Sequence, residues 1–193
     1  YPDMETKLTK LSQLFQGHRV SIFLCLSSFA DWSIGKFEKD PEFLQLTASD
    51  HPGLNFSWVP FIERIQSAIP QATVVVMENQ FLASHWAANI ALITGHPNSH
   101  TFSGVDQFPQ SLLPPAGKAH LKAVRAKDKP KSVHEWVEQT QVLIDQFSPD
   151  QRTSPLWSTD QIVYSQKQLE LDIDTLRDRP NVFIARDHYG DFS

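Results

Sequence analysis

The sequence predicts an α/β fold with a small, mostly parallel β-sheet flanked by helices and a mainly helical C-terminal half. Three short apolar runs, at residues 19–27, 73–77 and 181–185, have the length and composition of buried strands. Between them, apolar side chains recur every three or four residues, which indicates amphipathic helices. Strands that alternate with helices are typical of a parallel sheet covered by helices. The chain has 193 residues, of which 40% are hydrophobic, so one ordinary domain with a packed core is expected.

The N-terminal part of the chain predicts a helix over residues 4–15 and then the first strand. The apolar stripe of this helix consists of Met4, Leu8, Leu11 and Phe15. Gly17 ends the helix. The strand at 19–27 has no strict alternation, as expected for a strand covered on both faces. Its Cys25 is interpreted as a small buried side chain rather than a nucleophile.

Helices are also predicted on both sides of the second strand. Residues 29–37 form a short helix, and 38–56 form a loop. Ser57 is a candidate N-cap for the following helix, which Pro70 ends. A further helix follows the strand at 73–77 and stops at Gly95.

The C-terminal half is expected to contain one long surface loop and three helices. Residues 95–116 are rich in proline and glycine and predict the loop. Helices are predicted near 116–127 and around 136–147. The last helix opens with a capping box formed by Ser158 and Gln161.

Composition excludes several classes of function. A net charge of −5 argues against a general nucleic-acid partner. The apolar runs have the length of strands, far below the roughly 20 residues of a membrane span, and no membrane partner is expected. A single cysteine cannot form an internal disulfide, which favours a reducing compartment and a cytoplasmic location.

One segment, at 118–131, is strongly basic in this acidic chain. Its basic side chains are Lys118, Lys122, Arg125, Lys127, Lys129 and Lys131. Such a run is either the solvated face of a helix with its linker or an anion-binding surface, and the sequence leaves both interpretations open.

The short motifs of common catalytic and nucleotide sites are missing. The chain has no GxxxxGK[ST], GxGxxG, GxSxG or HExxH. His96 and His100 have a spacing that suits metal ligation on a helix, but Pro97 makes this segment a loop, so no metal is expected. Glu78, at the end of the second strand, is either a polar site residue or a carboxylate favoured by the start of the next helix.

The order of elements around the first two strands resembles the bacterial sulfotransferase family. In that family a strand ends in Arg, a Ser follows eight residues later on a short helix, and an aromatic residue comes two positions after it. A helix with a Trp then leads to a strand that ends in an aromatic-Glu-Asp triplet. The matching positions here are Leu26 at the strand end, Trp32, Phe37, Trp58, and the triplet Met77, Glu78 and Asn79. The late segment QKQLELDIDTL, at 166–176, is similar to the terminal helix of the family.

The resemblance implies a P-loop NTPase-like fold and transfer of a sulfuryl group from 3′-phosphoadenylyl sulfate (PAPS) to an alcohol or amine. The partners would be this nucleotide sulfate donor and a small-molecule or glycan acceptor. The P-loop of the family would precede Tyr1. Residues 1–193 are therefore expected to form a single sulfotransferase-like domain that lacks its N-terminal strand and P-loop.

The sequence departs from the family where the 3′-phosphate of the donor would bind. Ser27 stands at the position of the Arg and Gly35 at the position of the Ser, so a charged bidentate donor is replaced by a hydroxyl. The expected rim of the remaining nucleotide site is Ser27, Ser28, Ser33 and Gly35. No catalytic residue is assigned.

Three hypotheses follow. The chain is the body of a sulfotransferase that is inactive by itself because the P-loop segment lies upstream. Alternatively, it is a degenerate relative that keeps the fold as a non-catalytic binding or interaction module. The third hypothesis is an unrelated α/β transferase or interaction domain, because a similar order of elements is by itself a weak argument for function.

Overall fold

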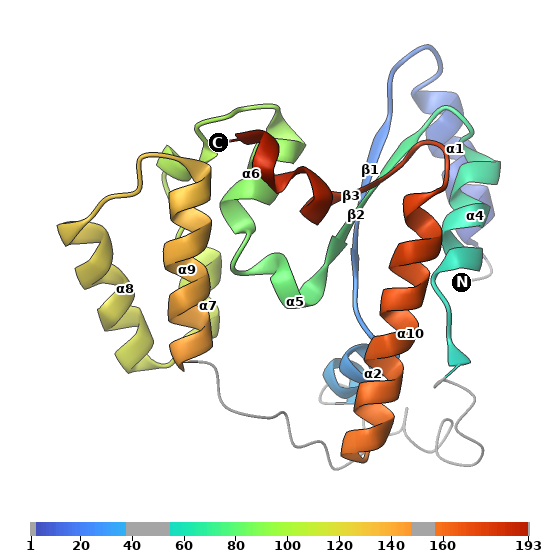
Figure 1. The fold of residues 1–193 in the computed structure, drawn as a ribbon. Helices are drawn as coiled ribbons and strands as arrows, with labels where there is room; N and C mark the ends of the chain where they lie inside the picture. Colours follow the sequence, from blue (N-terminus) through green and yellow to red (C-terminus); the bar gives the residue numbers. More distant parts are fainter. Residues whose placement is uncertain (1–2, 38–54, 148–156, 193) are drawn as a thin grey trace. The chain divides into compact units, whose positions relative to one another are not determined.

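The chain divides into two compact units, each of which has its own core (Figure 1). The computed structural model describes residues 3–37, 55–147 and 157–192. The first unit is formed by residues 1–76 and 153–184, and the second by 77–152 and 185–193. The predicted loop at 38–56 lies almost entirely outside the described residues.

The first unit contains the β-sheet, except for the last two residues of its central strand. The strands are β1 (Ser21–Leu26), β2 (Thr73–Glu78) and β3 (Val182–Ile184), in the order β1-β2-β3. β2 and β3 run parallel, and Val75 lies opposite Phe183. The predicted α/β class with a small parallel sheet in a largely helical chain is confirmed.

The described helices of the first unit are α1 (Met4–Leu14), α2 (Phe29–Phe37), α4 (Val59–Ala68) and α10 (Thr159–Arg177). α10 contacts α2, α4 and β3, whereas α1 packs against α4. The predicted capping box is present at the start of α10: Gln161 donates its backbone N–H to the Ser158 hydroxyl, and the Gln161 side chain accepts from the Ser158 N–H.

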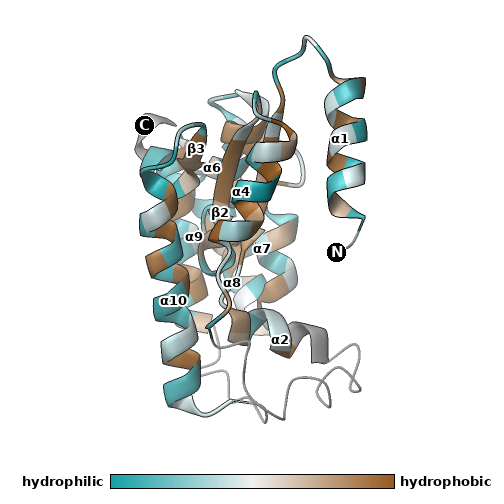
Figure 2. Cartoon of the chain, turned by 90° about the vertical axis from the view of Figure 1, so that its right-hand side faces the viewer, coloured by the Kyte–Doolittle hydropathy of each residue, from teal (hydrophilic) through white to brown (hydrophobic). Residues whose placement is uncertain are grey.

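The core of the first unit lies between one face of the sheet and the helices α4 and α10. Figure 2 shows that β2 is hydrophobic along most of its length, whereas α10 contains both hydrophilic and hydrophobic residues. The buried core residues are Leu26, Ile62, Ile65, Val74, Val76, Leu169, Ile173, Leu176, Val182 and Ile184. Alternate residues of each strand therefore point toward the same pair of helices.

The expectation that Cys25 is buried in a doubly covered strand is wrong. Cys25 is exposed, and its neighbour Leu26 is buried in the core. β1 is an edge strand, so its side chains alternate between the core and the opposite face. Nearby atoms still desolvate the sulfur and raise the pKa of the Cys25 thiol. A raised pKa disfavours the thiolate, which is the nucleophilic form of the side chain.

The second unit is helical. Its elements are α5 (Asn79–Leu82), α6 (Trp86–Thr94), η2 (Ser99–Thr101), α7 (Gln107–Leu112), α8 (Pro115–Lys127), α9 (Val133–Phe147) and η3 (Ala185–Phe192). α6 ends at Gly95, which adopts the left-handed conformation that glycine tolerates best. The helices predicted near 116–127 and 136–147 correspond to α8 and α9.

The expectation of a long surface loop at 95–116 is wrong. The segment contains η2, α7 and the first residues of α8, and its Val105 and Leu113 are buried. The prolines suggested a loop, but Pro109 lies in the first turn of α7 and Pro115 opens α8. At these positions the missing N–H of proline costs no helical hydrogen bond.

Two apolar clusters form the core of the second unit. Trp136 is buried among Ala87, Ala88, Val105 and Val133. The other cluster joins α8 to α9 through Leu113, Leu121 and Leu143. Gly117 lies at this contact, where a Cβ atom would approach Phe147 Cγ to 3.1 Å. The close approach of the two helices therefore depends on this glycine.

Candidate functional site

The family resemblance predicts the rim of a nucleotide site around the start of α2, where Ser28 lies. The Ser28 hydroxyl donates a hydrogen bond to the Asp31 carboxylate at 3.1 Å and accepts one from the Asp31 backbone N–H at 3.1 Å. Ser28 is buried, and its carbonyl accepts from the Trp32 N–H. Ser28 therefore stabilises the first turn of α2 and is accompanied there by a carboxylate.

Ser33 is also engaged within the protein. Its hydroxyl donates to the Ala30 carbonyl at 2.8 Å and accepts from the indole N–H of Trp157 at 2.8 Å. The backbone N–H of Ala30 donates to the Ser165 hydroxyl of α10 at 3.0 Å. Trp157 and Ser165, from a distant part of the chain, thus hydrogen-bond to polar groups that an anion would need.

Ser27 and Gly35 are the other two predicted rim residues. The Ser27 carbonyl accepts a hydrogen bond of 2.8 Å from the indole N–H of Trp58. Gly35 lies in the last turns of α2. Among the described residues, no Lys or Arg side chain hydrogen-bonds to Ser27, Ser28 or Ser33. The four predicted rim residues therefore share one strand–helix junction, but no cation accompanies them in the part of the chain that the structure describes.

A buried carboxylate of α10 positions the segment that begins α4. Asp172 accepts hydrogen bonds from the Ser57 hydroxyl at 2.7 Å and from the Trp58 N–H at 2.6 Å. The predicted N-cap at Ser57 is shifted by one residue, because Trp58 is the N-cap of α4. The Ser57 hydroxyl accepts from the Val59 N–H, so it still satisfies one amide of the first turn. Asp172 thereby orients Trp58.

An open cavity with an aromatic wall lies beside this junction, within the first unit. Its volume is about 750 Å³. The wall is formed by Phe29, Trp32, Phe56, Trp58 and Phe61. α1 contributes Met4, Leu8 and the charged Lys7. Cavities of this size with mostly apolar walls are typical of small-molecule sites.

Sequence reasoning missed this cavity. It assigned tryptophan and phenylalanine to the core, whereas Trp32 is 36% and Phe56 39% exposed. Two local signals were present: the segment 29–32 has two aromatic residues, and 56–61 has three. Their convergence depends on the contact of Phe29, at the start of α2, with Phe56, which sequence spacing does not give.

Glu78, the candidate at the end of β2, forms a buried ion pair. Only 3% of Glu78 is exposed, and its carboxylate lies 3.2 Å from Arg186 Nε of η3. Gln80 Nε2 donates to the same carboxylate at 3.3 Å, and the Arg186 guanidinium lies above the Phe81 ring. The Glu78 charge is thus compensated inside the second unit, which is what a buried carboxylate requires.

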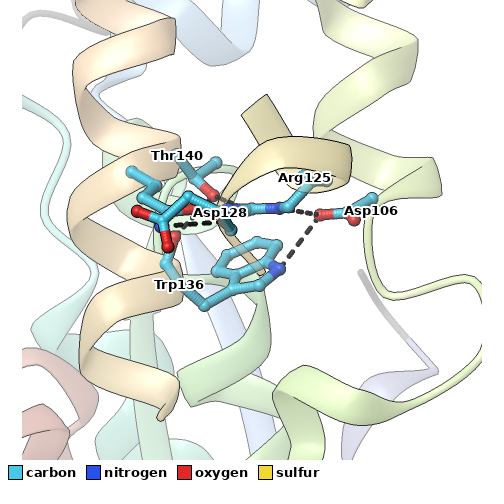
Figure 3. A network of polar contacts seen from close by, with 6 residues as sticks. Asp106, Arg125, Asp128, Trp136 and Thr140 are labelled. Atoms are coloured by element: carbon cyan, nitrogen blue, oxygen red, sulfur yellow. Dashed lines mark hydrogen bonds and ion pairs between the residues drawn. The ribbon is translucent and has the colours of Figure 1, made fainter. Parts of the chain in front are cut away.

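The basic segment at 118–131 separates into two kinds of side chain. Its five lysines are exposed. Arg125 instead donates to Asp106 at 3.2 Å and to Thr140 at 2.7 Å, contacts Gln139, and lies 5.2 Å from the Trp136 ring centroid (Figure 3). Burial lowers the pKa of Arg125, and Asp106 opposes this effect. Arg125 is a structural cation, and the lysines resemble a solvated face.

Of the histidines in the described residues, His85 has a serine hydroxyl beside it. The Ser84 hydroxyl lies 2.8 Å from His85 Nδ1, but Ser84 is fully buried and cannot reach a substrate. The His85 ring stacks on Tyr189, and burial lowers the pKa of His85. Burial also lowers the pKa of His100. No group of three His, Cys, Asp or Glu side chains suited to a metal ion occurs in the described residues.

Comparison with known proteins identifies no relative. No protein-family model matches the sequence, and no curated protein or solved structure matches it. Within the described parts of the chain, no helix has the length and apolar content that crossing a membrane requires. The family resemblance, the donor and the acceptor therefore stay predictions.

Proposed function

We propose that this chain is a binding module related to the bacterial sulfotransferases, with a P-loop NTPase-like fold, and that these residues do not by themselves transfer a sulfuryl group. The order of elements that resembles the family supports the relationship. The small parallel sheet with flanking helices is compatible with it. The junction at α2 supports the loss of donor binding.

One observation carries this proposal. The Ser28 and Ser33 hydroxyls and the N–H groups of Ala30 and Asp31 are all paired within the protein. A phosphate bound there would have to replace these bonds, each worth about 0.5–1.5 kcal/mol, and would meet the Asp31 carboxylate. The Arg that could offset this cost in the family is Ser27 here.

Calorimetric titration with 3′-phosphoadenosine 5′-phosphate, the nucleotide product of PAPS, tests the proposal directly. We expect no saturable binding at millimolar nucleotide. Saturable micromolar binding that Ser28→Ala weakens would contradict the proposal and would support the enzymatic hypothesis.

A restoring variant gives a positive test of the relationship. Ser27→Arg combined with Gly35→Ser reintroduces the two family side chains, and we expect measurable nucleotide binding in this variant. Ser67→Arg adds the same charge on the exposed side of α4 and is the control. If the double variant binds no better than Ser67→Arg, the relationship to the family loses its functional support.

A further inference from the structure

The aromatic cavity of the first unit has a wall that is organised before any ligand binds. Its rings form a continuous series, with centroid distances of 5.7 Å from Trp32 to Phe29, 5.7 Å from Phe29 to Phe56 and 4.8 Å from Phe56 to Trp58. Phe61 extends the series, with its centroid 5.9 Å from that of Trp58. Neighbouring rings in such contacts restrict one another, so little side-chain entropy is lost on binding.

Trp58 is fixed at the centre of this wall by polar contacts. Its indole N–H donates to the Ser27 carbonyl, and its backbone N–H donates to Asp172. The Ser57 hydroxyl, also at the cavity, is bound to Asp172. The polar groups of the wall are therefore already paired, and the wall offers a ligand mainly apolar surface.

The charged side chains at the cavity are Asp3, Lys7 and Arg64, two cations and one anion. Arg64 Nε lies 3.1 Å from Glu5, but both side chains are largely exposed, so this ion pair is weak. A guanidinium has five N–H donors, so others stay available. Lys7 is exposed and forms no ion pair with another described residue. Because Glu5 offsets Arg64 and Asp3 lines the same cavity, the attraction for an anionic head group comes mainly from Lys7.

We propose that this cavity binds a small amphipathic anion. Its apolar body would lie against the aromatic wall, and its carboxylate, sulfate or phosphate head would lie beside Lys7 and Arg64. The inference deepens the proposed function and rests on it only in treating the chain as a binding module. The wall and the head-group cations belong to the first unit, and the site uses none of the paired hydroxyls at the start of α2.

Binding is tested with decanoate, decanol and decylammonium, which share an alkyl chain and differ in head-group charge. Tryptophan fluorescence gives the affinity, at concentrations below those at which decanoate and decylammonium form micelles and below the solubility limit of decanol. We expect saturable binding of decanoate, about fivefold tighter than that of decanol, as an exposed ion pair provides. Decylammonium should bind most weakly.

Two variants locate the site. Lys7→Gln should remove most of the preference for decanoate over decanol, whereas Lys10→Gln, on the same helix but outside the cavity, should not. Trp32→Ala should weaken the binding of decanoate and of decanol about tenfold. Leu112→Ala truncates an exposed apolar side chain of α7 and is its control. Circular dichroism verifies that each variant is folded.

The inference is overturned if decanoate shows no saturable binding, if the three probes bind equally, or if Trp32→Ala leaves their affinities unchanged in a folded protein. Titration of the same sample with 3′-phosphoadenosine 5′-phosphate separates this outcome from failure of the proposed function. If the nucleotide binds, only the proposed function is contradicted. If decanoate does not bind, only the assignment of the cavity is contradicted.

Discussion

The Asp172 carboxylate of α10 accepts a hydrogen bond of 2.6 Å from the backbone N–H of Trp58, although the two residues are 114 positions apart. Only 7% of Asp172 is exposed. The same carboxylate binds the Ser57 hydroxyl, so one side chain satisfies two polar groups where α4 begins. This contact joins the late segment of the chain to the aromatic wall of the cavity.

Asp172→Ala should therefore destabilise the first unit. The Trp58 N–H and the Ser57 hydroxyl would lose a charged acceptor, and we expect a loss of about 2–4 kcal/mol in the free energy of unfolding. Urea denaturation measures it. Asp174→Ala removes an exposed carboxylate of the same helix, which pairs with Arg177, and should cost less than about 1 kcal/mol. Equal costs would show that Asp172 is not a specific anchor.

Among the basic side chains of the segment 118–131, Arg125 should be the only one whose loss strongly destabilises the second unit. Arg125→Met leaves Asp106 without its cation and removes the contact with the Trp136 ring, and we expect a cost of about 2–4 kcal/mol. Lys122→Met, on the exposed face of α8, should change stability by less than about 0.5 kcal/mol. Thermal unfolding followed at tryptophan emission compares the two variants.

Gly117→Ala should destabilise the contact between α8 and α9, although alanine favours helices. The new Cβ would lie 3.1 Å from Phe147 Cγ and 3.2 Å from Leu113 Cβ, so overpacking should cost about 1–3 kcal/mol and outweigh the propensity gain of about 1 kcal/mol. Phe147→Ala removes the ring but keeps Phe147 Cβ, which like Leu113 Cβ would lie 3.2 Å from the new methyl group. In that background the same substitution should cost less, and a cost that stayed unchanged would refute the role of the ring.

The pH dependence of stability should reflect His85. Burial lowers the pKa of His85 in the folded chain, so the unfolded chain takes up the proton first as the pH falls below about 6.5. The contribution of His85 to stability is therefore present above pH 6.5 and is lost as the pH falls toward the lower pKa of the folded state. Urea denaturation at pH values from 7.5 to 5 measures this slope.

His85→Asn should make the pH profile flatter below pH 6.5, whatever its effect on stability at neutral pH. The pKa of His100 is lowered in the same direction, so part of the slope should remain in this variant. His18→Asn alters an exposed histidine and is the control. An identical slope in His85→Asn and the parent protein would exclude His85 as its source.

The sequence was sufficient where structure depends on neighbouring residues. The span of α2, the capping box of α10 and the stop of α6 at Gly95 follow from spacing, cap chemistry and backbone freedom within a few positions. The same local rules failed for 95–116, because proline occurs both in loops and in first turns of helices.

The candidate site was predictable only in part. The sequence brought Ser27, Ser28, Ser33 and Gly35 to one junction, because all four lie in one strand–helix connection. It could not show that Trp157 and Ser165 from the late segment occupy the polar groups there. It also could not separate Arg125 from the neighbouring lysines, because only the fold places Asp106 and Trp136 beside it.

By itself the sequence determined most helices outside 95–116, the apolar strands and the α/β class, since these depend on periodicity and on local capping. The tertiary structure decided which face of β1 is covered, which charges are compensated and where the aromatic cavity lies. Each of these depends on side chains more than 15 residues apart in the chain, such as Trp32 and Trp58. Such side chains meet only when apolar burial packs α4 and α10 against one sheet and α2 packs against α10.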